Sequence, residues 1–290
     1  MKHRKLMALL ALVLTALVLF TACGEEEQKS EKKDDPTVLS KKIRVVAQKG
    51  APGIKVFRNM GDNYEIKTYK KIGDLRSAIK EGDYDAAILS TGIAGEMYER
   101  TKKGLVEVSP VSLDGIWVVA NGYNKNDFRL GYMINKNVVC MDKHSTADQV
   151  WQQVMNDGQQ SIAAVKMKYV NSYEASVKPF ASWSALVICA EPYASRLTKL
   201  SEVYKILDLA EIYRENGHGQ VPTDVLVVSK KMAKHRTDDV RIMKNEYETA
   251  LGTVRKSKAN LVFYNQSDRG IQLLREYNKT VGNKASYFEE

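Results

Sequence analysis

The chain has 290 residues, of which 44% are hydrophobic and 8% aromatic, and its 44 basic and 35 acidic side chains give a net charge of +9. This composition is ordinary for a globular protein and argues against a disordered or fibrous chain. The length is sufficient for one large domain or for two lobes of about 100–150 residues, each with a sizeable core.

The N-terminus resembles a bacterial lipoprotein signal. A cationic start is followed by an apolar run at residues 7–20, which is shorter than the roughly 20 residues of a membrane span. Small residues then lead into Cys23, the residue that such a signal presents for lipidation. We expect residues 1–22 to be a signal peptide and Cys23 to anchor the protein to the extracytoplasmic face of the cell membrane. An uncleaved anchor or an ordinary signal peptide is the alternative.

Residues 23–42 are expected to form a disordered tether. After Cys23 they carry six acids and five lysines, and only Val38 and Leu39 are sizeable apolar residues. Such a segment cannot bury enough apolar surface to offset the entropy lost when it becomes ordered.

The positive charge has two interpretations. Removal of the signal takes away three basic residues and leaves the mature chain at 9 − 3 = +6, which favours an anionic ligand or membrane surface. The basic residues form no clustered stripe, however, so scattered solvated lysines explain the charge as well. The sequence shows no nucleic-acid recognition motif, and we expect no nucleic-acid partner.

From residue 43 onward, short apolar strands alternate with helical patterns, which is typical of α/β proteins with mostly parallel sheets. The predicted strands are residues 43–47, 64–69, 84–90, 105–112, 115–122, 137–142, 161–167, 184–190, 203–209 and 223–229. The predicted helices are residues 54–60, 72–82, 91–104, 145–158, 191–200, 230–235, 237–257 and 267–278, with a broken helix at 171–183. Two α/β units followed by helices predict two lobes with a cleft between them.

Four strand–helix junctions predict where a ligand binds. Ligands of open parallel sheets lie beyond the carboxyl ends of the strands, where helix N-termini converge. The junctions at residues 49–53, 90–91, 142–146 and 191–193 occupy equivalent places in the two halves of the chain. Glycines in the first junction allow close approach to the backbone, and Ser and Thr in the others offer hydroxyl groups. We expect all four to meet at one cleft.

Several segments resemble a known family. They are "IRVVAQKGAPGIKVF", "YDAAILSTGIAGEMYE", "GIWVVANG", "ALVICAEPYAS" and "QVPTDVLVVSKK". In order and spacing they are similar to substrate-binding proteins of ABC importers, of the nitrate/sulfonate/bicarbonate and thiamine-precursor type. The likeness covers most of residues 43–257. It implies the type II periplasmic-binding-protein fold, an α/β fold of two lobes, each a mostly parallel sheet flanked by helices, with a two-crossover hinge.

The resemblance also implies lobe boundaries and ligand-binding residues. Lobe 1 would span residues 43–122, lobe 2 residues 123–221, and residues 222–290 would return to lobe 1 and end in helices. On the first-lobe side the motifs point to Lys49, Gly50, Gly53, Ser90, Thr91 and Trp117. On the second-lobe side they point to Lys143, His144, Ser145, Thr146, Glu191 and Tyr193, with Gln220 near the second crossover.

These assignments have structural alternatives. Ser and Thr at helix starts are N-caps in most proteins, and Trp117 within an apolar strand fits core packing as well as a ligand-stacking wall. The Glu191 carboxylate has the position of a helix cap as well as that of a ligand contact. Lys143 and His144 stand where relatives often carry a glycine-rich turn, which indicates either a different, anionic solute or a plain surface turn.

The sequence contains no catalytic constellation. His144, His218 and His235 lie far apart, and the Walker, dinucleotide-binding and nucleophile-elbow motifs are missing. We therefore predict no cofactor and no metal site. Cys140 and Cys189 are predicted to be buried and reduced, because adjacent parallel strands seldom have disulfide geometry. A disulfide between them is the alternative, since it is chemically permitted outside the cytoplasm.

Together these features predict a lipid-anchored, monomeric solute-binding protein that closes its hinge on a small anionic or aromatic solute and catalyses nothing. The resemblance implies delivery of that solute to an ABC permease and its ATPase. Two alternatives stay open. One is a thiamine-pyrimidine-synthase-like enzyme on the same fold, although the cysteine-rich motif of those enzymes is missing here. The other is a sensory or structural lipoprotein without solute binding.

Overall fold

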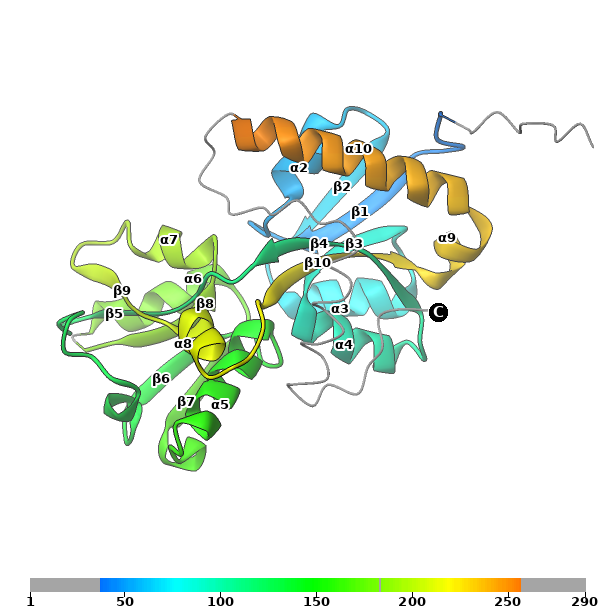
Figure 1. Cartoon of the computed structure of the whole chain (residues 1–290). Coiled ribbons are helices and arrows are strands. Elements are labelled where there is room, and N and C mark those ends of the chain that lie inside the picture. The colour runs from blue at the N-terminus through cyan, green and yellow to red at the C-terminus, as the bar shows by residue number, and fades with distance from the viewer. Residues whose placement is uncertain (1–36, 183, 257–290) are drawn as a thin grey trace, which may run out of the picture. The chain divides into compact units, whose positions relative to one another are not determined.

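The computed structural model describes residues 37–182 and 184–256, which are coloured in Figure 1. The predicted signal peptide, Cys23, most of the tether and the helix expected at 267–278 lie outside the described residues. The described chain forms two five-stranded sheets flanked by helices. We call the first sheet with its helices lobe 1 and the second sheet with its helices lobe 2.

The sheet of lobe 1 has the strand order β2-β1-β3-β10-β4. Its strands are β1 (Ile43–Gln48), β2 (Tyr64–Tyr69), β3 (Ala86–Ser90), β4 (Leu105–Leu113) and β10 (Pro222–Ser229). Strand β1 runs parallel to β2 and β3, whereas β10 is antiparallel to both β3 and β4. Among the described strands of this sheet only β10, which returns from lobe 2, opposes the others, in agreement with the predicted mostly parallel sheet.

Helices cover both faces of this sheet (Figure 1). They are α2 (Ile54–Asn59), α3 (Ile72–Glu81), α4 (Thr91–Arg100), α9 (Lys230–His235) and α10 (Thr237–Lys256). Helices α2 and α10 share a core in which the Phe57 ring lies 5.4 Å from the Tyr64 ring and 5.1 Å from the Tyr247 ring. Leu75 of α3 and Met97 of α4 belong to a separate core on the opposite face. The sheet is thus the middle layer between two apolar clusters.

The sheet of lobe 2 has the strand order β7-β6-β8-β5-β9. Its strands are β5 (Ile116–Asn121), β6 (Asn137–Met141), β7 (Lys166–Val170), β8 (Leu186–Ala190) and β9 (Val203–Asp208). Its helices are α5 (Thr146–Asp157), α6 (Tyr173–Val177), α7 (Tyr193–Leu197) and α8 (Leu209–Glu215), with 3₁₀ turns η1 (Leu130–Met133), η2 (Ile162–Ala164) and η3 (Lys178–Ala181). Strand β5, which enters from lobe 1, is antiparallel to β8 and β9, while β6 is parallel to β7 and β8.

In lobe 2, one predicted element was wrong and one helix was missed. The strand expected at 161–167 begins instead with the turn η2, and β7 starts only at Lys166. This strand lies at the edge of the sheet with its side chains half-exposed or exposed, so its apolar pattern is weak. Helix α8 was not predicted, because it follows β9 without a loop. Its N-cap is Asp208, which accepts hydrogen bonds from the backbone N–H groups of Ala210 and Glu211, both at 3.0 Å.

The chain changes sheets earlier than expected. Strand β5 pairs with β8 and β9 of lobe 2, so the change falls at residues 114–115 instead of near residue 122. An apolar run indicates a buried strand but carries no information about which of two sheets it joins.

Cys140 and Cys189 lie on neighbouring strands, but their side chains enter different cores. The register of β6 and β8 places Cys140 opposite Ile188. Cys140 packs in the core beneath α5 and α8, and Cys189 packs in the core beneath α6 and α7. Side chains on opposite faces of a sheet cannot form a disulfide. Both thiols are free and buried, which confirms the prediction.

Both thiols are expected to resist alkylation in the native protein. Burial raises the pKa of the Cys140 and Cys189 thiols and so disfavours the thiolate that reacts. Treatment with iodoacetamide followed by peptide mass mapping should find both unmodified in buffer and both modified in concentrated guanidinium chloride. Fast modification of either one in buffer would contradict this packing.

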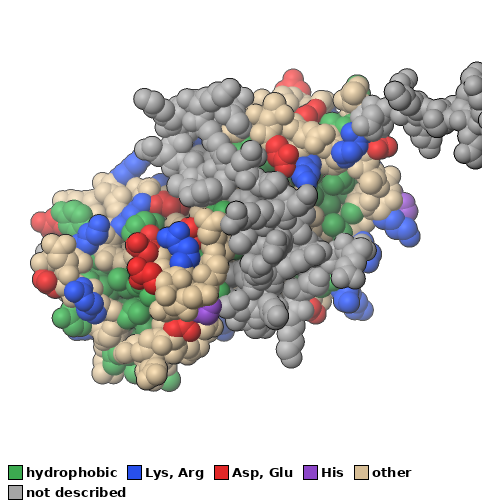
Figure 2. All heavy atoms as spheres, in the orientation of Figure 1, with side chains coloured by type: hydrophobic (Ala, Val, Ile, Leu, Met, Phe, Trp, Pro, Cys, Tyr) green, Lys and Arg blue, Asp and Glu red, His purple; other side chains and the backbone are tan. Residues whose placement is uncertain are grey.

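The surface carries mixed charge. On the face shown in Figure 2, basic and acidic side chains are interspersed among the described residues instead of forming a stripe. Within the described residues, no helix combines the length and the apolar character needed to cross a membrane.

Candidate functional site

Asp114 joins the two chain crossovers between the lobes. Its backbone N–H donates to the Val221 carbonyl at 2.7 Å, and its Oδ1 accepts from the Val221 N–H at 3.0 Å. Arg214 Nη1 lies 3.2 Å from Oδ2, and the Thr223 hydroxyl donates to the Asp114 carbonyl at 2.6 Å. Asp114 has a positive φ of 56°, and Gly115 follows with 68°, a conformation that Asp and Gly tolerate better than most residues. The pair of crossovers is therefore the predicted hinge.

Replacing Asp114 with alanine is expected to lower the free energy of unfolding by about 1–3 kcal/mol, because the buried Val221 N–H loses its acceptor. Urea unfolding followed by circular dichroism measures this change. The exposed Asp62 provides the control, since its replacement by alanine should leave stability nearly unchanged. Equal effects of the two replacements would contradict the structural role of Asp114.

The two lobes contact each other on the side of the helix starts. The Gly92 N–H of α4 donates to Thr146 Oγ1 of α5 at 3.2 Å, and the Tyr193 hydroxyl donates to the Lys49 carbonyl at 3.0 Å. A Cβ atom at Gly92 would lie 2.3 Å from the His144 carbonyl oxygen. Glycine is therefore required at this position for the two helices to approach so closely.

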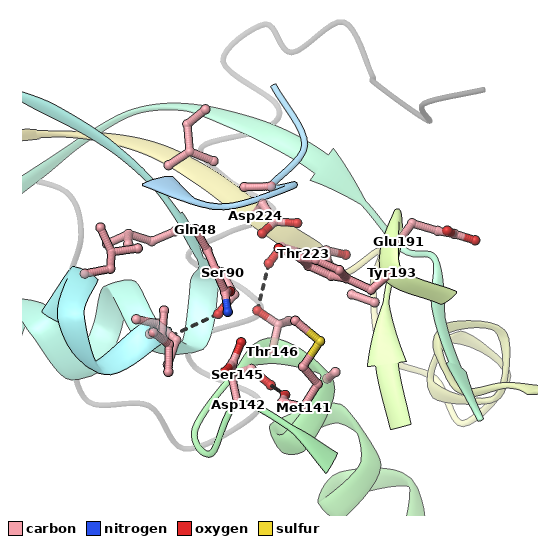
Figure 3. Close-up of a pocket in the computed structure, with 18 residues that line it drawn as sticks. Gln48, Ser90, Met141, Asp142, Ser145, Thr146, Glu191, Tyr193, Thr223 and Asp224 are labelled. Carbon is pink, nitrogen blue, oxygen red and sulfur yellow. Dashed lines mark hydrogen bonds between the residues drawn. The ribbon is translucent and has the colours of Figure 1, made fainter. Parts of the chain in front are cut away.

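Between the lobes lies a cavity of about 50 Å³, which we call the inner cavity (Figure 3). Its polar lining comes from Gln48, Ser90, Thr223 and Asp224 of lobe 1 and from Asp142, Ser145, Thr146, Glu191 and Tyr193 of lobe 2. The volume holds about three to five water-sized molecules. A whole solute of the usual pocket size, roughly 300 Å³ or more, would need the lobes to move apart.

Two buried carboxyl groups face this cavity. Figure 3 shows that Gln48, Asp142 and Asp224 reach into it from three different elements. Burial raises the pKa of Asp142 to about 7, although the neighbouring Gln48 and Arg76 lower it. Burial also raises the pKa of Asp224 to about 7 against the lowering effect of Ser112, whose hydroxyl donates to Oδ2 at 2.7 Å. Both groups therefore titrate close to neutral pH.

Two polar atoms of the inner cavity make no hydrogen bond of good geometry. Asp142 Oδ1 and Gln48 Nε2 are buried without such a bond to a described residue, although Gln48 lies close enough to Asp142 to lower its pKa as a hydrogen-bond donor. Asp142 is 6% exposed and Gln48 is 9% exposed, so bulk water cannot satisfy them freely. Buried polar atoms without partners are costly to the fold. Asp142 also has a positive φ of 62°, which is uncommon outside glycine and frequent at functional sites.

The structure brings five of the predicted residues to the inner cavity: Ser90, Ser145, Thr146, Glu191 and Tyr193. The hydroxyl groups are already engaged. Ser90 accepts from the Ile93 N–H of α4 at 3.4 Å, and Ser145 accepts from the Asp148 N–H of α5 at 3.3 Å. Thr146 donates to the Thr223 carbonyl at 2.8 Å. Ser90 and Ser145 are therefore the N-cap residues of α4 and α5, which was the structural alternative for them.

Glu191 acts as a helix cap. Its carboxylate accepts from the Ser195 N–H at 3.1 Å and from the Ser195 hydroxyl at 3.0 Å, and it forms an ion pair with Lys205. Pro192 is the N-cap residue of α7 instead of the first helical residue, and the Glu191–Pro192 peptide bond is cis. The carboxylate thus stabilises the turn into α7, which was the structural alternative for this acid.

Lys49, Gly50 and Gly53 line a second cavity of about 600 Å³, which we call the outer cavity. Five basic side chains surround it: Lys49, Lys55, Arg58, Arg196 and Lys199. Gly50 has a φ of 88°, and a Cβ there would lie 2.8 Å from Arg196 Nη1. The Arg196 guanidinium stacks over the Tyr173 ring at 3.8 Å from its centroid. Ala51 lines both the inner and the outer cavity, so the two cavities adjoin.

Five other predicted residues line neither of these cavities. Thr91 is fully buried and donates to the Pro222 carbonyl at 2.5 Å. Lys143 and His144 have exposed side chains, as expected of a surface turn. Gln220 is half-buried in the segment before β10.

Trp117 was expected on the first-lobe side, but it belongs to β5 in lobe 2. It packs against the core that contains Cys189, and Lys205 Nζ lies 5.0 Å from the centroid of its ring. Trp117 therefore packs against the core of lobe 2 and does not line a described cavity.

Sequence reasoning missed Gln48, Asp224 and most of the basic side chains of the outer cavity. An acid inside the otherwise apolar strand at 222–229 was an available signal for Asp224. Gln48 stands at the end of an apolar strand, just before the predicted junction at 49–53. The basic residues of α2 and α7 had no distinguishing local pattern. In the described chain no group of three or more His, Cys, Asp or Glu side chains is placed to hold a metal ion.

The fold of this chain is similar to that of several proteins of known structure. No family model and no curated protein matches the chain. A ligand-binding component of an ABC-type import system from Staphylococcus aureus with zinc bound is similar in structure at 12% identity and a TM-score of 0.61, with 83% of this chain and 84% of that chain covered. The alkanesulfonate-binding protein SsuA from Xanthomonas axonopodis pv. citri bound to MOPS is similar at 13% identity and a TM-score of 0.61, with 85% of each chain covered.

The periplasmic aliphatic sulphonate binding protein SsuA from Escherichia coli is similar at 12% identity and a TM-score of 0.60, with 83% of this chain and 79% of that chain covered. The two mixed sheets with their flanking helices define the type II periplasmic-binding-protein fold. Of the similar proteins named here, one is a ligand-binding component of an import system and two are sulfonate-binding proteins. At such low identity the likeness extends to the fold alone.

Proposed function

We propose that the protein is an extracytoplasmic solute-binding lipoprotein that captures a small molecule between its lobes and delivers it to an ABC importer. The observation that carries the proposal is the inner cavity, where Asp142 Oδ1 and Gln48 Nε2 are buried without hydrogen bonds of good geometry at the contact of two hinged lobes. Because unpaired buried polar groups destabilise a closed protein, they favour a ligand that supplies the missing hydrogen bonds.

The proposed mechanism is hinge closure. With the lobes apart, a solute enters between the helix starts of α4 and α5. Closure around the hinge at Asp114 then buries the solute and forms the contacts from Gly92 to Thr146 and from Tyr193 to Lys49. These contacts connect the lobes directly, so the closed form would be stabilised jointly by the solute and by the protein. No step in this cycle makes or breaks a covalent bond.

The location and the partners follow from the N-terminal sequence and from the similar proteins. Cys23 would carry the lipid that holds the mature chain at the outer face of the cell membrane, with residues 24–42 as the tether. The partners would be an ABC permease and its ATPase. Replacement of Cys23 by alanine should release the protein from the membrane fraction, and retention of the variant there would contradict the anchor.

A thermal-shift screen of the mature protein tests the proposed function. Compounds should include alkanesulfonates, MOPS, nitrate, aromatic thiamine precursors, amino acids and amines. A solute at 100 times its dissociation constant stabilises the native state by about 2.7 kcal/mol. A hit should also reduce the radius of gyration in solution scattering, because binding closes the lobes. Absence of any shift at millimolar concentration would contradict solute binding, and conversion of a hit into a product would favour an enzyme.

A further inference from the structure

Three acids line the inner cavity, and one of them, Glu191, is paired with Lys205. Asp142 and Asp224 are 6% and 8% exposed, and neither forms an ion pair with a described Lys, Arg or His. The charge of Arg76 lowers the pKa of Asp142, but the Arg76 guanidinium donates to Glu96 and to the Lys143 carbonyl. Two carboxyl groups without a cation are an unfavourable lining for an anionic solute.

The other groups around the two carboxyls do not supply positive charge. Tyr193 lies close enough to both Asp142 and Asp224 that their charges raise the pKa of its hydroxyl, after burial as the main cause. That hydroxyl donates to the Lys49 carbonyl instead of to a carboxylate. The buried Cys140 thiol is a further neighbour of Asp142 and is neutral. These neighbours therefore leave Asp142 and Asp224 without a cation in direct contact, a place that an ammonium group of a ligand could fill.

The outer cavity has the opposite character. None of its five basic side chains, Lys49, Lys55, Arg58, Arg196 and Lys199, forms an ion pair with a carboxylate of the described chain. Its volume of about 600 Å³ is large enough for most of a small solute. An anionic group placed there would meet several cations at once, and guanidinium groups suit carboxylate, sulfonate and phosphate oxygens alike.

We propose that the solute is a small zwitterion whose protonated amine lies in the inner cavity against Asp142 and Asp224 and whose anionic group lies in the outer cavity. This inference rests on the proposed solute-binding function. It is supported by Ala51, which lines both cavities, so that a cavity with an acidic lining and one with a basic lining share a wall residue. The inner cavity admits an aminomethyl group, whereas the bulk of the solute needs the larger volume outside.

The selectivity of binding tests this inference. Isothermal titration calorimetry of the mature protein would compare ω-amino carboxylates and ω-amino sulfonates of two to six carbons with analogues that lack the amine and with alkylamines that lack the anion. We expect at least one zwitterion to bind, and we expect removal of either charged group to weaken its affinity by tenfold or more. An analogue without the amine that binds as tightly as the zwitterion would overturn the proposal.

Matched variants assign the two charges to the two cavities. Asp142→Asn and Asp224→Asn should each weaken the zwitterion at least tenfold, while the exposed control Asp62→Asn should not. In the outer cavity, Lys55→Gln combined with Arg58→Gln should weaken the zwitterion but leave the affinity for the matching alkylamine unchanged. The exposed Lys125→Gln is the control for charge. Unchanged affinity in both aspartate variants would overturn the proposal.

Proton release distinguishes an ammonium group in the inner cavity from a neutral ligand. Burial raises the pKa of both carboxyls, so the pair should hold protons near neutral pH that an ammonium group displaces. Calorimetry in two buffers of different ionisation enthalpy should therefore show net proton release on binding near neutral pH and less release at pH 8.5. The release should be smaller in each of the Asp142→Asn and Asp224→Asn variants, and net proton uptake by the wild type on binding would contradict the proposal.

The failures of the two proposals are distinguishable. A zwitterion series without binding, alongside a simple anion or an aromatic compound that shifts the melting temperature, contradicts the zwitterion and leaves solute binding intact. Tight binding of a divalent metal ion that abolishes zwitterion binding, and that chelator reverses, also contradicts the amine in the inner cavity. No shift with any compound of either screen contradicts the proposed function itself.

Discussion

Replacement of Asp224 by asparagine should make the solute-free protein more stable at pH 8, by roughly 1–3 kcal/mol. Burial raises the pKa of Asp224 from its ordinary 3.8 to about 7 in the folded chain, and each pKa unit corresponds to about 1.4 kcal/mol. We expect less than the full equivalent of that shift, because relaxation around a buried carboxylate and water penetration lower the cost of its charge. Asparagine keeps the shape and an acceptor for the Ser112 hydroxyl but needs no ionisation.

The expected pH dependence has a definite sign. Between about pH 4 and pH 7 the folded chain binds more protons at Asp224 than the unfolded chain does, so the stability of the wild type should fall as pH rises. This contribution of Asp224 to the stability of the folded chain is fully present below its ordinary pKa of 3.8. It is lost as the pH rises past the raised pKa of about 7. Asp142, with a pKa of about 7, acts in the same direction. The gain from Asp224→Asn should therefore be small at pH 4.5 and largest at pH 8.

Urea unfolding of the solute-free protein at pH 4.5, 6 and 8 measures this difference. Asp62→Asn, an exposed replacement in lobe 1, should show no comparable trend between these pH values. If Asp224→Asn destabilised the protein equally at all three pH values, the carboxyl would be a structural hydrogen-bond partner of Ser112 and not a strained binding group. A variant that is more stable yet binds less is the expected behaviour of a residue retained for binding.

Most elements of the fold could be predicted because they depend on local patterns. The apolar strand at 43–47, the helix at 72–82 and the strand at 184–190 each have a period and an end signal within their own residues. The sheet to which β5 belongs could not be predicted in this way. Its partners β8 and β9 lie more than sixty residues away in the sequence, and nothing in "GIWVVANG" distinguishes an outer strand of lobe 1 from an inner strand of lobe 2.

The candidate site was predictable where it depends on the ends of strands. The junction rule placed Ser90, Ser145 and Tyr193 at what is now the inner cavity, because the ends of parallel strands gather at one edge. It did not select Asp224, which lies within β10 and reaches the cavity only because that strand runs against its neighbours. Nor could it show that Lys143 points to solvent, since a turn sequence does not fix which atoms face the ligand.

The clash at Gly92 offers a test of closure itself. Gly92→Ala should weaken binding of a hit from the thermal-shift screen about tenfold or more. A Cβ there would lie 2.3 Å from the His144 carbonyl oxygen and 2.9 Å from the Ser145 carbonyl carbon, both in the backbone of lobe 2. Backbone atoms cannot turn away as a flexible side chain can, so α4 and α5 must separate. The closed state then becomes less populated, and the apparent affinity falls in the same proportion.

Gly73→Ala is a closely matched control for this variant. Gly73 and Gly92 are each the second residue of a ten-residue helix, α3 and α4, so alanine should favour the helix equally in both. A Cβ at Gly73 meets nothing within 4 Å. Calorimetric affinity and the solute-induced decrease in the radius of gyration should both be lost in Gly92→Ala and kept in Gly73→Ala. Equal affinity of the two variants would show that binding does not require the contact between α4 and α5, and hinge closure would then have to be abandoned as the mechanism.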